Sequence, residues 1–390
     1  MDYVPSIQKC SETNEKGRYD MKDPRLEKLA DILINYSVSL QKGEHLLINC
    51  TVDEIPLVRE LIRKTYDAGG YPHINISNNE LKKEFLKNLS QPQAEAMAEW
   101  EEIRMNRMDA YISVATSGNP MELSEVPQEK LALYANVVDK KVNKKRREGR
   151  VKWCVTIYPS QVYAYSAFMS LEQFEDYYFK VCCLDYTRLG ESMDKLRKIL
   201  EDADHVFIRS PGTEIAFSIK GVPKMASKGE RNLPDGEVYT APVRESVNGY
   251  ITFNVPSIYQ GTRYENIYLA FKNGKVVQAE SNYTKRLNAV LDTDEGARYV
   301  GEFAFGLNPY LHTPVGLTLF DEKIHGSIHF ALGNALDLTD NTNRSSIHWD
   351  LVSIHRPEFG GGEVWIDGIL IRKDGKFIPP DLKALNGTNY

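Results

Sequence analysis

Residues 45–77 read HLLINCTVDEIPLVRELIRKTYDAGGYPHINIS, and this stretch decides the fold of the first half of the chain. Its first six residues form an apolar run that predicts a buried strand. The segment IPLVRELIRKTYDA places apolar residues at helical spacing and stops at Gly69-Gly70, which predicts an amphipathic helix. The closing segment, YPHINIS, is typical of a second strand. A strand, a helix and a strand in this order indicate an α/β layer with an open sheet.

The same alternation of helices and strands continues on both sides of this stretch. Pro24 suits the first turn of a helix whose apolar residues recur at helical spacing until about Gly43. The other elements that we expect in this half are strands over residues 109–116 and 151–159 and helices over residues 79–105, 127–148, 170–181 and 184–205. We therefore predict a flexible N-terminal tail over residues 1–22 and an N-terminal α/β domain over residues 23–205.

The pattern of residue types changes at about residue 206. Short β-type runs such as VFIRS, IAFSI and IYLAF now alternate with Gly, Asn and Pro, which indicates many strands joined by turns. We expect one clear helix here, over residues 292–305, and closing hairpin-like strands with turns at Gly368 and Gly375. A chain of 390 residues usually exceeds what one hydrophobic core supports. Residues 206–390 are therefore predicted to form a second domain, a β-rich α+β metal-binding domain.

Composition excludes several classes of protein. Hydrophobic residues make up 42% and charged residues 26% of the chain, as in ordinary folded proteins, and the net charge of −6 disfavours a general nucleic-acid binder. No stretch approaches the roughly 20 apolar residues that span a bilayer, and the polar N-terminus lacks the apolar core of a signal peptide. The five cysteines show no metal-binding spacing and are expected to be reduced thiols. We expect a cytoplasmic protein that binds neither membranes nor nucleic acid.

The histidines of the chain are unevenly distributed. Five of the eight fall within a short part of the second half, namely His312, His325, His329, His348 and His355. His348 and Asp350 are two residues apart in the predicted strand IHWDLV, so their side chains would share one face while Trp349 and Leu351 fill the other. This spacing is also typical of an ordinary half-exposed strand. An imidazole and a carboxylate in buried surroundings, however, need a partner or a metal ion.

The segment DEKIHGSIHFALG (321–333) offers two more histidines. Gly326 and the alternation after it predict a strand, on which His325 and His329 would share a face but lie roughly 13 Å apart. One ion cannot bind both imidazoles. His329 lies inside the apolar run and is the better candidate for a ligand, whereas His325 is expected to be peripheral.

Carboxylates complete the candidate ligand set. On the predicted helix over residues 292–305, Glu302 shares a face with Glu295 and Arg298 and has apolar neighbours, although a solvated acidic face is the alternative. The motifs H-E-x-x-H and G-x-S-x-G of other hydrolases are absent from the sequence. Carboxylates mixed with two imidazoles instead suit a pair of divalent ions that a bridging carboxylate holds together.

With these segments in place, the chain resembles the aminopeptidase T/aminopeptidase S family of metallopeptidases from about residue 24 to about residue 377. The most specific matching pieces are NLPDGEVYTAPV (232–243), SVNGYITFN (246–254), DEGARYVGE (294–302), LFDEK (319–323), IHFALG (328–333) and IHWD (347–350). Several motifs in the same order are a far stronger signal than any one of them.

The resemblance implies a homodimeric, metal-dependent aminopeptidase that releases N-terminal residues from short peptides by means of a water activated between two divalent ions, which would be Zn, Co or Mn. The metal ligands that it implies are Glu237, Glu302, Glu322, His329, His348 and Asp350. Glu302 would bridge the two ions, and Glu322 would bind metal or act as the catalytic base. The match at Glu322 crosses two extra residues before His329.

One position departs from the family pattern. The family has a tyrosine seven residues after the first histidine, and this chain has Leu336 there, which can neither donate a hydrogen bond nor bind metal. Tyr310 could substitute for it, or catalysis could be weakened, or the substrate could be unusual. Two other functions therefore stay open: a mononuclear Fe(II) ring-cleaving dioxygenase that uses His329, His348 and Asp350, and a non-catalytic metal- or peptide-binding homologue. Glu237 and Glu302 favour two metals.

Overall fold

The structure is a computed structural model that describes residues 23–115, 122–142, 149–387 and 390. The predicted tail over residues 1–22 lies outside the described residues, and so does the end of the helix predicted over residues 127–148. Among the described residues, no helix combines the length and the apolar character that crossing a bilayer requires.

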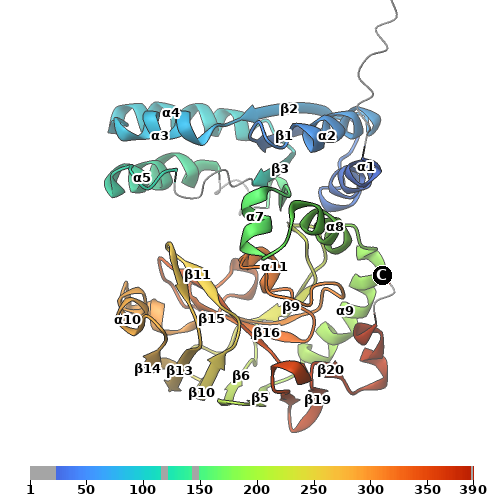
Figure 1. Cartoon of the computed structure of the whole chain (residues 1–390), viewed down its shortest axis with the longest axis vertical. Coiled ribbons are helices and arrows are strands. Elements are labelled where there is room, and N and C mark those ends of the chain that lie inside the picture. The colour runs from blue at the N-terminus through green and yellow to red at the C-terminus, as the bar shows by residue number, and fades with distance from the viewer. Residues whose placement is uncertain (1–22, 116–121, 143–148, 388–389) are drawn as a thin grey trace, which may run out of the picture.

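The N-terminal half is built on a parallel sheet with helices around it (Figure 1). Its five described strands run in the order β2-β1-β3-β4-β8, and each neighbouring pair is parallel. They are β1 (His45–Cys50), β2 (Tyr71–Ile76), β3 (Ala110–Ala115), β4 (Lys152–Ile157) and β8 (Asn232–Leu233). The predicted open α/β sheet is thus confirmed. Since β8 comes from beyond residue 205, a short strand of the second half completes the first sheet.

The helices of this half follow the predicted segments except α7, which was not predicted. They are α1 (Pro24–Asp31), η1 (Ile32–Ser37), α2 (Ile55–Asp67), α3 (Asn79–Lys87), α4 (Gln91–Met105), α5 (Gln128–Tyr134), η2 (Ala135–Asp139), α7 (Gln161–Ser166), α8 (Leu171–Cys182) and α9 (Tyr186–Glu201). Their starts have local causes. Asp23 accepts a hydrogen bond from the amide of Arg25 at the start of α1, and Ser170 and Gln173 form a reciprocal capping box at the start of α8.

The second half is β-rich, as predicted, and its two larger sheets are antiparallel. The larger one runs in the order β14-β13-β10-β6-β5-β18-β19-β20 and the smaller one in the order β17-β16-β15-β9-β7. The larger sheet contains β5 (His205–Ser210), β6 (Thr213–Ser218), β10 (Asn248–Phe253), β13 (Ile267–Lys272), β14 (Lys275–Glu280), β18 (Glu363–Ile366), β19 (Ile369–Lys373) and β20 (Lys376–Phe377). The smaller sheet contains β7 (Met225–Ser227), β9 (Glu237–Thr240), β15 (Val300–Gly306), β16 (Ser327–Gly333) and β17 (His348–Ile354).

The other elements of this half are short. They are the hairpin of β11 (Ser257–Tyr259) and β12 (Thr262–Tyr264), the helices α10 (Thr284–Leu291) and α11 (Thr318–Asp321), and the 3-10 turns η3 (Glu295–Arg298), η4 (Asp337–Thr339), η5 (Pro357–Phe359) and η6 (Pro380–Asn386). The predicted turns at Gly368 and Gly375 join β18, β19 and β20 into antiparallel hairpins. In Figure 1, α11 lies between these sheets and the N-terminal half.

Aromatic side chains fill the space between the two larger sheets. The ring of Phe217 on β6 lies 5.0 Å from that of Phe303 on β15 and 5.4 Å from that of Phe330 on β16, in edge-to-face contacts. Successive side chains of a strand point to opposite faces. Glu302 and His329, which neighbour these two phenylalanines along the chain, therefore lie on the far face of the smaller sheet.

The predicted helix over residues 292–305 is wrong. Residues 295–298 form only the 3-10 turn η3, and the chain enters strand β15 at Val300. Asp294 caps the short turn through the amide of Ala297, and the alternation in VGEFAFG then suits a strand buried on both faces. Glu295 is consequently exposed and pairs with Arg244, whereas Glu302 is buried, so the two carboxylates do not share a face.

Candidate metal centre

One face of the smaller antiparallel sheet gathers carboxylates and imidazoles from four neighbouring strands. Glu237 lies on β9, Glu302 on β15, His329 on β16, and His348 with Asp350 on β17. In the register of the sheet, Ala331 pairs with both Glu302 and Asp350, and Ala304 pairs with His329. Small alanine side chains between the polar residues leave this face open for the longer side chains to converge.

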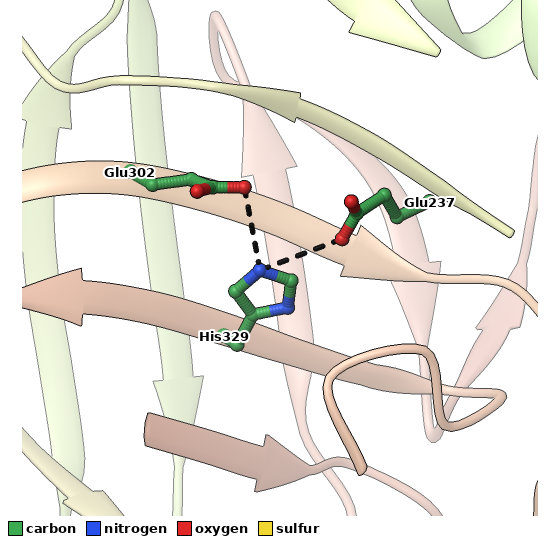
Figure 2. A group of neighbouring side chains, drawn as sticks. All are labelled: Glu237, Glu302 and His329. Carbon is green, nitrogen blue, oxygen red and sulfur yellow. Dashed lines mark ion pairs between the residues drawn. The ribbon is translucent and has the colours of Figure 1, made fainter. Parts of the chain in front are cut away.

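Glu237, Glu302 and His329 form a buried set that we name the inner group. Figure 2 shows the two carboxylates pointing toward the imidazole from neighbouring strands. His329 Nε2 lies 3.6 Å from Glu237 Oε2 and 3.5 Å from Glu302 Oε1. One atom from each residue lies within 4.8 Å of the others, which is the spacing that ligands of a single ion can share.

Glu302, His348 and Asp350 form a second set, the outer group, which is less deeply buried. His348 Nε2 lies 3.4 Å from Glu302 Oε2 and 3.6 Å from Asp350 Oδ1. Glu302 therefore belongs to both groups and faces each of them with a different oxygen. This is the arrangement that a carboxylate bridging two ions requires.

Main-chain carbonyl groups orient both imidazoles. His329 Nδ1 lies 3.0 Å from the carbonyl oxygen of Glu322, and His348 Nδ1 lies 2.8 Å from that of Asn334. A carbonyl oxygen can only accept a hydrogen bond, so in the neutral rings Nδ1 carries the proton and Nε2 presents its lone pair to the carboxylates. Metal-binding histidines are commonly held in this way by their second nitrogen.

In the metal-free protein these imidazoles bind protons strongly. Burial opposes the charge on His329, but the hydrogen bond to Glu302 and the charge of Glu237 outweigh it and raise the pKa of His329 to about 9. Burial likewise opposes the charge on His348, yet Asp350 and Glu302 raise its pKa to about 10. The pKa of Glu302 is lowered, since its two histidine partners outweigh its burial. In the metal-free protein, protons on the two imidazoles thus occupy the positions at which metal cations would bind.

The donor set fits divalent metal ions. Oxygen and nitrogen donors of this mixture suit zinc, cobalt or manganese. Glu237 Oε2 is buried without a hydrogen-bond partner among the described residues, which is costly for a carboxylate unless a cation lies beside it. The inner and outer groups therefore place such donors at two adjacent positions, and Glu302 is common to both.

The sixth predicted ligand, Glu322, lies beside these groups and does not belong to either of them. It follows α11, and its Oε1 accepts a hydrogen bond of 2.5 Å from Lys323 Nζ. Burial raises the pKa of Glu322, although Lys323 opposes this shift. The structure therefore places the Glu322 carboxyl beside the inner and outer groups, with one oxygen already bonded to a lysine.

The sequence reasoning missed three neighbours of the cluster. Lys323 is the most prominent of them, because its Nζ lies 2.7 Å from Glu237 Oε1. Asp235 is fully buried 4.0 Å from the same ammonium, and Tyr239 shares the face of β9 with Glu237. Burial and the charges of Glu302 and Glu237 raise the pKa of Tyr239, so its phenol stays protonated. The segments GEVYT and LFDEK contained two of these residues, but nothing in their spacing indicated burial beside a ligand.

Other candidates lie elsewhere. The His325 ring contacts His312 at 5.9 Å, and neither histidine belongs to the inner or outer group. The hydroxyl of Tyr310 donates to the carbonyl oxygen of Tyr390, so nothing supports it as a substitute for the missing tyrosine. Leu336 stands at the start of turn η4.

A small pocket adjoins the outer group. Asp350 lines it together with apolar side chains from the segment before β11, from β11 and from β17, namely Val255, Pro256, Ile258 and Val352. Asp321 also lines this pocket, and its carboxylate accepts hydrogen bonds from the amides of Val315 and Gly316. A ligand in this pocket would have one end beside Asp350 and the rest against apolar surface.

A buried sheet face with two groups of metal donors, one shared carboxylate and an adjoining pocket defines a metalloenzyme. Residues 22–377 match the thermophilic metalloprotease (M29) family, so the chain belongs to that family and is a metal-dependent peptidase. This confirms the family and the class of enzyme that the motifs of the sequence indicate.

Several known proteins are similar over most of their length. Aminopeptidase 2 of Geobacillus stearothermophilus is 26% identical in an alignment of 409 positions, which covers 92% of this chain and 96% of the relative. Aminopeptidase T of Thermus thermophilus is 27% identical over 346 residues, covering 80% of this chain and 84% of the relative. The solved structure of AmpT from Thermus thermophilus superimposes with a TM-score of 0.77 at 22% identity, over 91% of this chain and 99% of the other, and confirms the fold.

Proposed function

We propose that this protein is a metal-dependent aminopeptidase that removes the N-terminal residue from short peptides. The observation that carries the proposal is the pair of imidazoles whose Nδ1 atoms are fixed by main-chain carbonyls while both Nε2 atoms face Glu302. Membership of a metalloprotease family supports peptide hydrolysis. The relatives that cover most of the chain are named as aminopeptidases, which supports attack at the N-terminus.

Two divalent ions, Zn, Co or Mn, would be held by the inner and outer groups. Glu237 and His329 would bind the inner ion, His348 and Asp350 the outer one, and Glu302 both. When bound, such a pair lowers the pKa of a water between the ions and polarises the carbonyl of the scissile bond. Glu237 and Glu302 are donors beyond the two histidines and one aspartate that a mononuclear iron dioxygenase needs. Their presence supports the peptidase over that alternative.

Residues of the chain would supply the proton transfer and the binding of substrate. Glu322 has one oxygen engaged by Lys323 and a raised pKa, so Oε2 is suited to take a proton from the attacking water and pass it to the leaving amine. Asp350 lines the pocket, and its oxygen that does not bind the outer ion would attract the positive α-amino group of the peptide. The apolar wall formed by Val255, Pro256 and Val352 would contact the side chain of the N-terminal residue.

We also propose a cytoplasmic homodimer. The four cysteines of the described residues are free thiols, as is usual in a reducing compartment. Strand β2 lies at an edge of the N-terminal sheet and exposes Tyr71, Ile74 and Ile76. A second copy of the chain could cover these side chains, and sedimentation of the purified protein would measure the assembly.

The activity can be tested with a panel of dipeptides and aminoacyl-p-nitroanilides, each compared with its N-acetylated form. We expect turnover of the free-amine substrates, loss of turnover after treatment with a chelator, and recovery when Zn²⁺, Co²⁺ or Mn²⁺ is restored. Acetylation should abolish cleavage because the charged amine is lost. Turnover that survives the chelator, or equal cleavage of acetylated substrates, would contradict the proposal.

A further inference from the structure

A fully buried lysine lies inside the carboxylate cluster. Lys323 Nζ is 2.7 Å from Glu237 Oε1, 2.5 Å from Glu322 Oε1 and 4.0 Å from Asp235 Oδ1, and the side chain is 1% exposed. Three acidic partners in the interior stabilise an ammonium that burial alone would disfavour. The cluster therefore already holds one cation that belongs to the chain itself.

The backbone on both sides fixes the position of this ammonium. The amide of Lys323 donates to the carbonyl oxygen of Phe320, and its own carbonyl oxygen accepts from the amide of Asn308. The neighbouring side chains Phe320 and Ile324 are fully buried. Since the main chain is held and the side chain is enclosed, Lys323 cannot swing out when a metal ion approaches.

Lys323 affects the two groups of donors differently. Among the described residues its ion pairs are with Glu237, Glu322 and Asp235, so it contacts the inner group through Glu237. The ion pairs within the outer group run between Glu302, His348 and Asp350. An ion in the inner group would share the Glu237 carboxylate with the ammonium, and like charges in a buried site repel each other strongly.

We propose that Lys323 makes the two metal positions unequal: the outer group binds its ion tightly, and the inner group binds the second ion more weakly. This inference rests on the proposed two-ion site. The ammonium occupies Glu237 Oε1 and leaves Oε2 as the free oxygen. It also neutralises part of the acidic charge of the inner group before any metal arrives. Both effects reduce the gain from binding an ion there.

The test is a calorimetric titration of the metal-free protein with Zn²⁺, repeated with Co²⁺ so that visible absorption reports each bound ion. We expect two binding events whose affinities differ by about tenfold or more. Lys323→Gln, which removes the charge and keeps a polar side chain, should narrow the difference to about threefold or less. Lys224→Gln is the matched control, because Lys224 is also buried but its Nζ donates to the carbonyl oxygen of Ile219. The Lys224→Gln variant should keep the wild-type difference between the two metal affinities.

The assignment of the tight event to the outer group has its own test. Asp350→Asn should abolish the tight event, since Asp350 belongs only to the outer group. Equal affinities in the wild type, a tight event that survives in Asp350→Asn, or an unchanged difference in folded Lys323→Gln would each overturn the inference. If Lys323→Gln does not fold, Lys323→Met removes the same charge in its place, while the wild type and Asp350→Asn show which group binds the tight ion.

The proposed function can fail separately from this inference. A wild type that binds a single ion at every concentration would contradict the two-ion part of the proposed function. In that case Lys323→Gln tests the role of the lysine. Binding of a second ion by this variant would support that role, and binding of only one ion would overturn it. Two equal ions with chelator-sensitive aminopeptidase activity would overturn only the role of Lys323.

Discussion

At the scale of single residues, two carbonyl oxygens determine which nitrogen each imidazole offers to the cluster. Those of Glu322 and Asn334 hold the Nδ1 atoms of His329 and His348, so each ring has one fixed tautomer when it is neutral. Glu302 lies between the two Nε2 atoms and contacts each with a different oxygen. Among the residues that the structure describes, its side chain is thus the one that belongs to both the inner and the outer group.

Glu302→Gln should therefore weaken metal binding by both the inner and the outer group. The amide keeps the shape of the side chain but loses the negative charge and replaces one acceptor with a donor. We expect weaker binding at both positions and a loss of about 100-fold or more in kcat/KM. Elemental analysis after dialysis and steady-state kinetics would measure the two effects. The exposed Glu358→Gln serves as control, and full metal content in folded Glu302→Gln would rule out the bridging role.

The sequence allowed some of these positions to be predicted and not others. Ordered motifs indicated Glu237, Glu302, His329, His348 and Asp350, which the structure brings together, although their roles as ligands stay predictions. Lys323 was missed because a lysine after two acidic residues in LFDEK is typical of a solvated turn. Only the packing of α11 against α8, where Phe320 lies 6.4 Å from Phe174, shows that this turn is buried.

At the scale of elements, strands were recognised where apolar runs and turn residues agreed, and the segment over residues 292–305 shows where this reasoning failed. Glu295, Arg298 and Glu302 have helical spacing, but in the fold each forms ion pairs with different residues. Val300 to Gly306 instead alternates between the aromatic core and the polar face. Because pairing with β9 and β16 satisfies the backbone of this segment, long-range contacts override the local helical pattern.

Gly301 makes this strand possible next to Glu302. The register of β15 and β16 shifts between Val300 and Glu302, and a Cβ at Gly301 would lie 2.5 Å from the carbonyl oxygens of both Gly333 and Asn334. We expect Gly301→Ala to lower the free energy of unfolding by about 1–3 kcal/mol, as in other overpacked sites. It should also weaken metal binding, since both Glu302 and the Asn334 carbonyl that orients His348 would shift.

Urea unfolding and metal titration of Gly301→Ala would measure these effects. Gly387→Ala is a suitable control, because a Cβ there would meet only the carbonyl oxygen of Ala384 at an ordinary 3.4 Å. If Gly301→Ala matched the wild type in both measurements, the bulge would have no role in placing Glu302.

At the scale of the whole molecule, stability depends on what balances the buried acidic charge of the metal centre. Lys323 balances part of it permanently. In the metal-free protein, protons balance more of it: His329 and His348 hold protons because their carboxylate partners raise their pKa values to about 9 and about 10, and burial raises the pKa of Glu237 to about 8. In the proposed metal site, metal ions would compete with these protons for the same Nε2 atoms, which would couple pH, metal binding and folding.

This coupling predicts how the metal-free protein responds to alkaline pH. Histidines of the unfolded chain release their protons near pH 6.5, whereas the folded protein retains those of His329 and His348 until about pH 9 and 10. The folded state binds more protons in this window, so stabilisation that is complete below about pH 6.5 declines as the pH rises. Bound metal replaces the protons, and the metal-loaded protein should not show this decline.

The measurement is the melting temperature between pH 6.5 and 9, with chelator and with Zn²⁺. We expect the chelated protein to lose stability across this range, so that the gap between the two forms widens with pH. His348→Gln removes one of the two imidazoles whose pKa values are raised, and its chelated form should show a shallower decline. The opposite result would be a melting temperature of the chelated wild type that is constant or rises from pH 6.5 to 9, together with the same pH dependence in His348→Gln. This result would show that the imidazoles do not hold these protons in the folded protein.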